Sequence, residues 1–311
     1  MDSSENQVAH EYIPYFRAYK DGRVERFFGS DRVPPAIDDS DQNGVFSKDV
    51  IIVSETGLSA RIFIPAAAIK PGQHRLPLVV YYHGGGFFMG SPFCSVYNNF
   101  VSSLAAKANA IAVSVDYRLA PEHYIPVAYE DSWAALKWVA CHCNGQGPEA
   151  WLNNYVDFHR VFLAGDSAGG NLLHNVAVQA TVEDLNGVKL SGICLIHPYF
   201  GRQDGGVDKC WTFVCPTTSG SADHRINPSV DSRLSSLRCA RVLVCIAEKD
   251  NLKARGLFYY GTLRDSEWAG EVEIAETEGE GHVFHLFNPN SERAVTLKEK
   301  MASFINQHNA S

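Results

Sequence analysis

The chain has 311 residues, of which 45% are apolar and 20% charged, a composition typical of a folded globular protein rather than a disordered one. Its formal net charge of −8 argues against nucleic acid or an anionic membrane as a partner, because both attract basic proteins. No apolar run approaches the ~20 residues that a membrane-spanning helix needs. The N-terminus lacks the basic start and apolar core of a signal peptide, so we expect a cytoplasmic protein.

The first 45 residues or so lack a regular pattern but are rich in apolar side chains. Residues Tyr12–Phe16 form an apolar cluster, and Tyr19–Phe27 predicts a hairpin around Asp21-Gly22. Apolar residues at this density should pack against something. We therefore expect residues 1–45 to form part of a lid rather than a disordered tail.

From Val45 onward, strand-like and helix-like runs alternate. The predicted strands are Asp49–Val53, Ser59–Ile64, Leu78–Tyr82, Ile111–Val115, Val161–Ala164, Gly192–Ile196, Val242–Ala247 and Val272–Ala275. The predicted helices are Tyr97–Ala108, Asp131–Cys141, Asn171–Val178, Gly256–Ser266 and Glu292–Asn306. Apolar strands between helices predict a mostly parallel, twisted sheet with helices on both faces. We expect one α/β domain over residues 1–311.

A segment without periodicity separates the strand ending at Ile196 from the strand that begins at Arg241. Insertions after the carboxyl end of a strand often build lids over the sites of such sheets. We predict the second half of the lid at about residues 198–230. Trp211, within it, is a candidate substrate contact.

A nucleophile is predicted at Ser167. Gly165–Gly169 reads G-x-S-x-G, follows the strand Val161–Ala164 and precedes the helix-like run Asn171–Val178. This is the strand–turn–helix context of a nucleophile elbow, whose glycines keep the turn free of Cβ atoms. Alone the motif is weak, because it arises often by chance.

A second motif strengthens the prediction. His83–Phe87 reads H-G-G-G-F and follows the strand Leu78–Tyr82. A flexible turn is the plain alternative, but bare backbone N–H groups here would suit the negative oxygen of a tetrahedral intermediate. We expect the oxyanion hole to consist of the N–H groups of Gly85, Gly86 and Ala168.

A serine nucleophile also needs a base and a group that orients the base. Asp250 lies just past a strand end and His282 lies in a glycine-flanked loop, giving the order Ser…Asp…His of α/β-hydrolases. The alternative role for Asp250 is to cap the following helix. Glu248, two residues earlier, is the other candidate for the carboxylate that orients the base. His285 is the rival to His282 as the base.

Phe87, Phe88 and Met89 follow the glycine run and are candidates for lining an acyl pocket, although ordinary core packing explains them equally well. The eight cysteines are scattered, and we expect free thiols in a reducing compartment. Cys141-His142-Cys143 is too closely spaced for a common zinc site, and no second pair follows, so no metal is expected.

Together, these motifs resemble those of the plant carboxylesterases of the hormone-sensitive-lipase group. The resemblance runs from about Tyr12 to Phe304, and Tyr19–Arg26 is similar to the branch that contains the 2-hydroxyisoflavanone dehydratases. The motifs that carry it are His83–Gly86, Asp116–Glu122, Gly165–Gly170 and Gly281-His282. It implies an α/β-hydrolase core, a lid and a Ser167–His282–Asp250 triad, with Asp116, Arg118 and Glu122 in a structural ion-pair loop.

The resemblance also frames the alternatives. At the position where the family has a longer segment that contains a helix, this chain has only the short segment Gly201–Asp208. The length of this segment affects how far the lid can close over the site. Gibberellin-receptor relatives lack the triad histidine, so His282 argues against a ligand receptor. Dehydratase and cyclase relatives use the same pocket for elimination, in which His282 would be the base.

We expect a serine carboxylesterase that hydrolyses a small or mid-sized ester, such as a plant specialised metabolite. The expected partner is this small-molecule substrate, and the expected oligomeric state is a monomer or a homodimer. No cofactor is expected.

Overall fold

The computed structural model describes residues 7–307, except residues 71, 186, 203 and 205. Eight strands form one sheet in the order β11-β10-β9-β8-β6-β7-β5-β4. Only β5 runs antiparallel to its two neighbours, β4 and β7, so the prediction of a mostly parallel sheet is confirmed. The strands are β4 Val45–Val53, β5 Leu58–Pro65, β6 Leu76–Tyr82, β7 Ile111–Asp116, β8 Val156–Asp166, β9 Leu190–Ile196, β10 Arg241–Ala247 and β11 Glu271–Thr277.

The two faces of this sheet carry separate apolar cores. In the central strand β6, Leu78, Val80 and Tyr82 belong to one core, and Val79 and Tyr81 belong to the other. This alternation follows from the two-residue repeat of a strand. Because both faces are covered, the central strands are apolar along their whole length, which is the pattern seen in the sequence.

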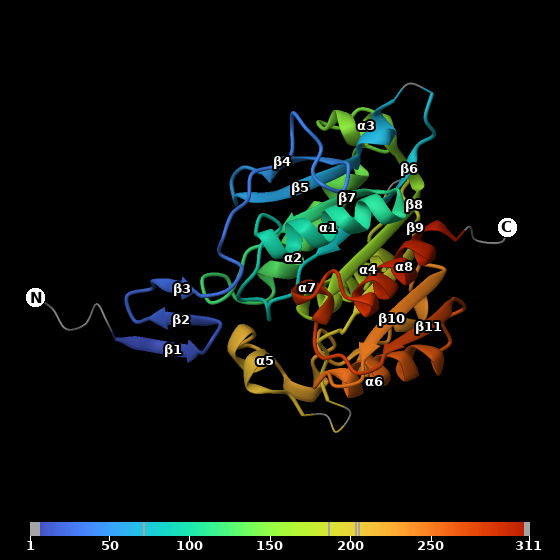
Figure 1. Cartoon of the computed structure of the whole chain (residues 1–311). Coiled ribbons are helices and arrows are strands. Elements are labelled where there is room, and N and C mark those ends of the chain that lie inside the picture. The colour runs from blue at the N-terminus through green and yellow to red at the C-terminus, as the bar shows by residue number, and fades with distance from the viewer. Residues whose placement is uncertain (1–6, 71, 186, 203, 205, 308–311) are drawn as a thin grey trace, which may run out of the picture.

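Helices cover both faces of the sheet (Figure 1). Helices α1 and α8 pack against each other and share the core of Val79, whereas α2, α4 and α6 contribute to the core of Val80. The helices are α1 Ser95–Ala108, α2 Val127–Ala140, α3 Ala150–Tyr155, α4 Ala168–Val182, α5 Lys209–Val214, α6 Lys253–Arg264, α7 Phe284–Phe287 and α8 Glu292–Asn306.

The long helices were predictable and the short ones were not. The bounds of α8 agree with the prediction, whereas α3 and α5 have six residues each and were missed. Fewer than two turns cannot display a 3.6-residue repeat. Each of these short helices instead begins at an acidic cap: Glu149 accepts a hydrogen bond from the N–H of Trp151, and Asp208 accepts one from the N–H of Trp211.

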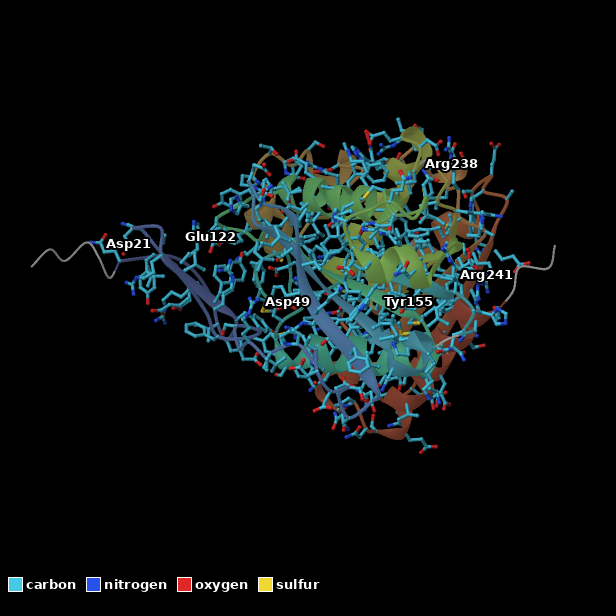
Figure 2. All side chains as sticks on the ribbon, turned by 90° about the horizontal axis from the view of Figure 1, so that it is seen from above. Asp21, Asp49, Glu122, Tyr155, Arg238 and Arg241 are labelled. Atoms are coloured by element: carbon cyan, nitrogen blue, oxygen red, sulfur yellow. The ribbon has the colours of Figure 1, made fainter. Side chains whose placement is uncertain are left out.

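The N-terminal segment forms a small antiparallel sheet of its own, which stands apart from the main sheet and next to α5 (Figure 1). Its strands are β1 Val8–Tyr12, β2 Phe16–Tyr19 and β3 Val24–Arg26. The hairpin predicted around Asp21-Gly22 is present, and Asp21 lies at the tip farthest from the body of the molecule (Figure 2). Strand β1 was not predicted, since the segment as a whole showed no regular pattern.

The small sheet contacts the segment after Ile196. The Tyr12 hydroxyl donates to the backbone carbonyl of Lys209, the first residue of α5. The buried ring of Phe16 lies 5.5 Å from the ring of Phe213 in α5 and 4.8 Å from that of Phe88. The two segments predicted to form a lid therefore meet each other, and both meet the residues after the glycine run.

No helix among the described residues is long and apolar enough to cross a bilayer. All eight cysteines are free, as expected from their scatter.

The start of α4 packs so closely on β6 that Gly169 has no space for a side chain: a Cβ there would lie 1.9 Å from the carbonyl oxygen of Tyr82. We predict that Gly169→Ala lowers the free energy of unfolding by at least about 1–3 kcal/mol through overpacking. The matched control is Gly261→Ala in α6, where nothing lies within 4 Å of the new Cβ. That change should stabilise the protein by up to about 1 kcal/mol. Urea unfolding of both variants measures the difference, and equal stabilities would contradict this packing argument.

Candidate active site

Ser167 occupies a strained turn between β8 and α4, with φ 52° and ψ −117°. A non-glycine residue held there costs on the order of 1–3 kcal/mol, so its surroundings must fix it. The Ser167 N–H donates to the carbonyl of Ile196 at 2.8 Å, and its own carbonyl accepts from the N–H of Tyr199 at 3.0 Å. These two hydrogen bonds fix the turn to the end of the neighbouring strand β9.

The glycines of the elbow are explained by close approach. A Cβ on Gly165 would lie 2.6 Å from the Tyr82 carbonyl oxygen and 2.7 Å from the backbone of Gly169. Real Cβ atoms do not come this close. The elbow therefore takes its shape from glycines on both sides of Ser167, as predicted from the motif.

The structure brings the three predicted triad residues together from loops far apart in the sequence. His282 Nε2 lies 3.0 Å from Ser167 Oγ, and His282 Nδ1 lies 2.8 Å from Asp250 Oδ2. The side chain of Asp250 is 1% exposed and that of His282 is 35% exposed. A base that reaches the surface and a buried carboxylate that orients it form the arrangement that activates a serine.

The Asp250 carboxylate makes hydrogen bonds both to the candidate base and to the backbone just before α6, although Leu252, not Asp250, is the N-cap residue of that helix. Its Oδ2 faces His282, while its Oδ1 accepts from the N–H of Leu252 at 2.7 Å, at the start of α6. Burial opposes ionisation, but the hydrogen bond and charge of His282 outweigh it and lower the pKa of Asp250 below its usual value. The carboxylate therefore stays ionised and keeps the imidazole oriented.

The two rival residues have other surroundings. Glu248 accepts a hydrogen bond from the N–H of Gly279 and so supports the loop that carries His282. His285 lies in the core, with its ring 4.8 Å from that of Phe100, and burial lowers its pKa to about 3. His285 therefore stays neutral and does not reach Ser167.

Three backbone N–H groups are free near Ser167. Those of Gly85, Gly86 and Ala168 donate to no protein acceptor in the described part of the chain. Gly85 and Gly86 have φ values of 100° and 62°, which favour glycine. The N–H of Gly84 is not free, because the Tyr97 hydroxyl and Asp166 Oδ1 accept from it. The loop therefore has two unused donors, both among the residues predicted for the oxyanion hole.

A buried carboxylate, Asp166, ties the glycine run to the elbow. It accepts hydrogen bonds from the hydroxyls of Tyr81 and Tyr97 as well as from Gly84. Burial raises its pKa, against the lowering effect of these bonds. This network could not be predicted from the sequence, because a tyrosine in a strand and another in a helix carry no local signal of a shared partner.

Arg26, at the end of β3, holds the other side of the same loop. Its Nε donates to the carbonyl of Phe88 at 2.7 Å, and its Nη2 donates to the carbonyl of Ala120 at 3.0 Å. The guanidinium also makes a bidentate ion pair with Glu122, which lies where the small sheet joins the body (Figure 2). Arg118 pairs instead with Asp131. Of the three residues expected in a structural ion-pair loop, Arg118 and Glu122 do form ion pairs, and Arg26 is the unforeseen partner of Glu122. Asp116 forms no ion pair among the described residues and accepts hydrogen bonds from the hydroxyls of Ser59 and Ser91 instead.

The aromatic candidates for the substrate pocket lie mostly in the core. Phe87, Phe88 and Trp211 are buried, and the rings of Phe87 and Trp211 are 6.0 Å apart. Met89 is partly exposed. Of the two alternatives left open for Phe87 and Phe88, their burial favours core packing, and a substrate contact by any of the four stays a prediction.

One cluster among the described residues, His197, Asp250 and His282, has the spacing of a metal site. Its donors do not fit one. His197 Nδ1 accepts a hydrogen bond from the N–H of Val283, so its proton sits on Nε2 and no ring lone pair is left for a cation. Asp250 is already bonded to His282 and Leu252.

Comparison with known proteins identifies the family. Residues 79–286 match the family of the alpha/beta hydrolase fold. The chain belongs to this family. It is 45% identical over 96% of its length to "Probable carboxylesterase 7" of Arabidopsis thaliana, covering 99% of that protein. It is also 38% identical over 97% of its length to a 2-hydroxyisoflavanone dehydratase of Glycyrrhiza echinata, covering 98% of that protein. The expected membership of the plant carboxylesterase group is thereby confirmed.

Solved structures of other proteins support the same family assignment. A thermostable carboxylesterase cloned from a metagenomic library is 28% identical and superposes with a TM-score of 0.70 over 87% of this chain and 90% of its own. An esterase of Pyrobaculum calidifontis is 30% identical, with a TM-score of 0.64 over 83% and 84%. The chain is an enzyme of the esterase class with an α/β-hydrolase fold.

Proposed function

We propose that this protein is a serine carboxylesterase that hydrolyses a small or mid-sized ester through Ser167, His282 and Asp250. The observation that carries the proposal is the continuous hydrogen-bonded chain from Asp250 through His282 to Ser167, at 2.8 and 3.0 Å. Unused backbone donors lie in the adjoining loop. This set of groups serves a reaction that forms a tetrahedral oxyanion.

Acylation would proceed as follows. Ser167 Oγ attacks the ester carbonyl carbon while His282 Nε2 takes the serine proton, and Asp250 stabilises the resulting imidazolium. The carbonyl oxygen becomes an oxyanion held by the N–H groups of Gly85, Gly86 and Ala168. The intermediate collapses, the bond to the alcohol oxygen breaks, and the alcohol leaves with the proton from His282. An acyl group remains on Ser167.

Deacylation would repeat these steps with water. His282 takes a proton from a water molecule, whose oxygen attacks the acyl carbon, and the same N–H groups hold the second oxyanion. The carboxylic acid then leaves, and the proton returns to Ser167 Oγ. The cycle needs no oxidant, reductant or cofactor.

A dehydratase is the second candidate, favoured by the similarity to the Glycyrrhiza echinata enzyme. In that reaction His282 would remove a proton next to a carbonyl, and a hydroxyl would leave as water. Such a reaction needs no nucleophile at position 167. The intact Ser167–His282 contact therefore supports hydrolysis over elimination.

The surroundings of the site support the remaining parts of the proposal. The aromatic contacts between β2, α5 and the glycine loop suit a lid formed by the described parts of residues 1–45 and 198–230 over a single domain. Residues 1–6, 203 and 205 of these ranges lie outside the described residues. Free thiols suit the cytoplasm. We assign the substrate to the esters of plant specialised metabolism on the basis of the plant relatives, and the working unit to a monomer or a homodimer.

Ser167→Ala should reduce the hydrolysis of p-nitrophenyl acetate and butyrate by a factor on the order of 10⁴ or more, because the nucleophile is lost. The thermal midpoint should stay near that of the wild type. Both proteins should also be assayed with 2-hydroxyisoflavanone. If the wild type dehydrates that compound efficiently and cleaves no ester above background, the hydrolase proposal is wrong and the dehydratase alternative replaces it.

The base can be distinguished from its neighbour by pH profiles. In the wild type, kcat/KM should fall as the pH falls, because a protonated imidazole cannot take the serine proton. His282→Ala should lose a factor on the order of 10⁴ in kcat. His285→Leu should keep the acidic limb and most of the activity, because the pKa of His285 is already lowered to about 3 and its ring is buried. If the fall in kcat/KM at low pH disappears in His285→Leu, then His285 rather than His282 is the base.

A further inference from the structure

His197 is a buried histidine beside the site for which the proposed reaction has no chemical step. It follows β9 directly and has a left-handed backbone, with φ 47°. Its own N–H donates to the carbonyl of Cys245 in β10 at 2.8 Å. Its side chain is buried, and its ring centroid lies 5.9 Å from that of His282.

The only hydrogen bond of this side chain among the described residues goes to the loop that carries the base. His197 Nδ1 accepts from the N–H of Val283 at 2.9 Å. Val283 directly follows His282 and has φ 47° and ψ 33°. A β-branched residue is a genuine outlier in this region, so the backbone beside His282 is strained and needs support.

Burial keeps the acceptor available. It holds the pKa of His197 well below the ordinary value, with His285 and His282 acting in the same direction and Asp250 opposing them. The ring is therefore neutral, with its proton on Nε2 and a lone pair on Nδ1. The N–H of Val283 thus has a permanent acceptor.

The same segment also supports the nucleophile. The carbonyl of Ile196, one residue earlier, accepts the hydrogen bond from the N–H of Ser167. The backbone of residue 196 thus fixes Ser167, and the side chain of residue 197 fixes the residue after His282. The positions of the nucleophile and of the base therefore both depend on the same two residues at the end of β9.

We propose that His197 is a positioning residue whose Nδ1 holds Val283 in its left-handed conformation and thereby sets the His282 imidazole in line with Ser167 Oγ. The proposal rests on the proposed hydrolysis at Ser167. The side chain takes no part in proton transfer. It holds the imidazole of His282 in position, because a displacement of a catalytic group by about 1 Å can lower the rate ~10²-fold.

Four variants test the proposal. His197→Asn keeps an acceptor at the same distance from Cβ and tolerates a positive φ. His197→Gly tolerates that φ but has no acceptor, and His197→Leu restores bulk without an acceptor. Val283→Gly relieves the strain that His197 is proposed to hold. Active sites are counted by burst titration with p-nitrophenyl acetate, so that kcat refers to folded enzyme.

The Gly and Leu variants should lose roughly 10- to 100-fold in kcat with KM changed by less than about 3-fold, and the Asn variant should stay within about 3-fold of the wild type in both. In a Val283→Gly background, the loss caused by His197→Gly should shrink to less than about 3-fold. Such non-additivity marks an interaction between the two residues, which a general contribution to folding would not produce.

Wild-type kcat in both the Gly and Leu variants, or an equal loss with and without Val283→Gly, would overturn the proposal. So would an Asn variant as slow as the Gly variant. Ser167→Ala is assayed in parallel. If the wild type cleaves esters and Ser167→Ala does not, the proposed function holds, and the His197 variants then test only the positioning role. If both proteins cleave esters only at the background rate, the proposed function itself has failed.

Discussion

The sharp turn at Ser167 sets most of the remaining geometry. Strand β8 lies at the centre of the sheet, and α4 must begin immediately after it, which forces a positive φ on a residue that is not glycine. Gly165 and Gly169 permit the turn because the end of β6 lies too close for any Cβ. The same approach brings the loop after β6 next to Ser167. Thus the contact that shapes the elbow also places the loop that carries Gly85 and Gly86.

Strain is concentrated at this edge of the sheet, and hydrogen bonds hold each strained residue. Phe87, Ser167, His197 and Val283 all have positive φ values. The carbonyl of Phe87 accepts from the N–H of Ala120, Ser167 bonds to the end of β9, and Val283 bonds to His197. Asp166 and Arg26 fix the two sides of the glycine loop. Donors fixed before substrate arrives need no reorganisation when charge develops, which is how such sites gain rate.

Much of the fold and of the geometry around Ser167 was predictable because the signals are local. The glycine spacing around Ser167, the glycine run after β6 and the chain order of Asp250 and His282 can all be seen in short stretches of sequence. What was missed depends on pairs of residues far apart in the chain. Arg26 with Glu122 and His197 with Val283 show no pattern in either partner's neighbourhood. Phe87 illustrates the same limit, because its sequence position fits a pocket wall and the core equally well.

The central claim, that a serine ester hydrolysis site is preformed around Ser167, is tested most directly by a crystal structure after reaction with a p-nitrophenyl alkylphosphonate. This reagent leaves a tetrahedral phosphonate that mimics the intermediate. We predict a covalent bond from Ser167 Oγ to phosphorus. We also predict that the phosphonyl oxygen lies about 2.7–3.1 Å from the nitrogens of Gly85, Gly86 and Ala168. A wild-type protein that stays unlabelled at Ser167, or an adduct whose oxygen points away from these nitrogens, would contradict it.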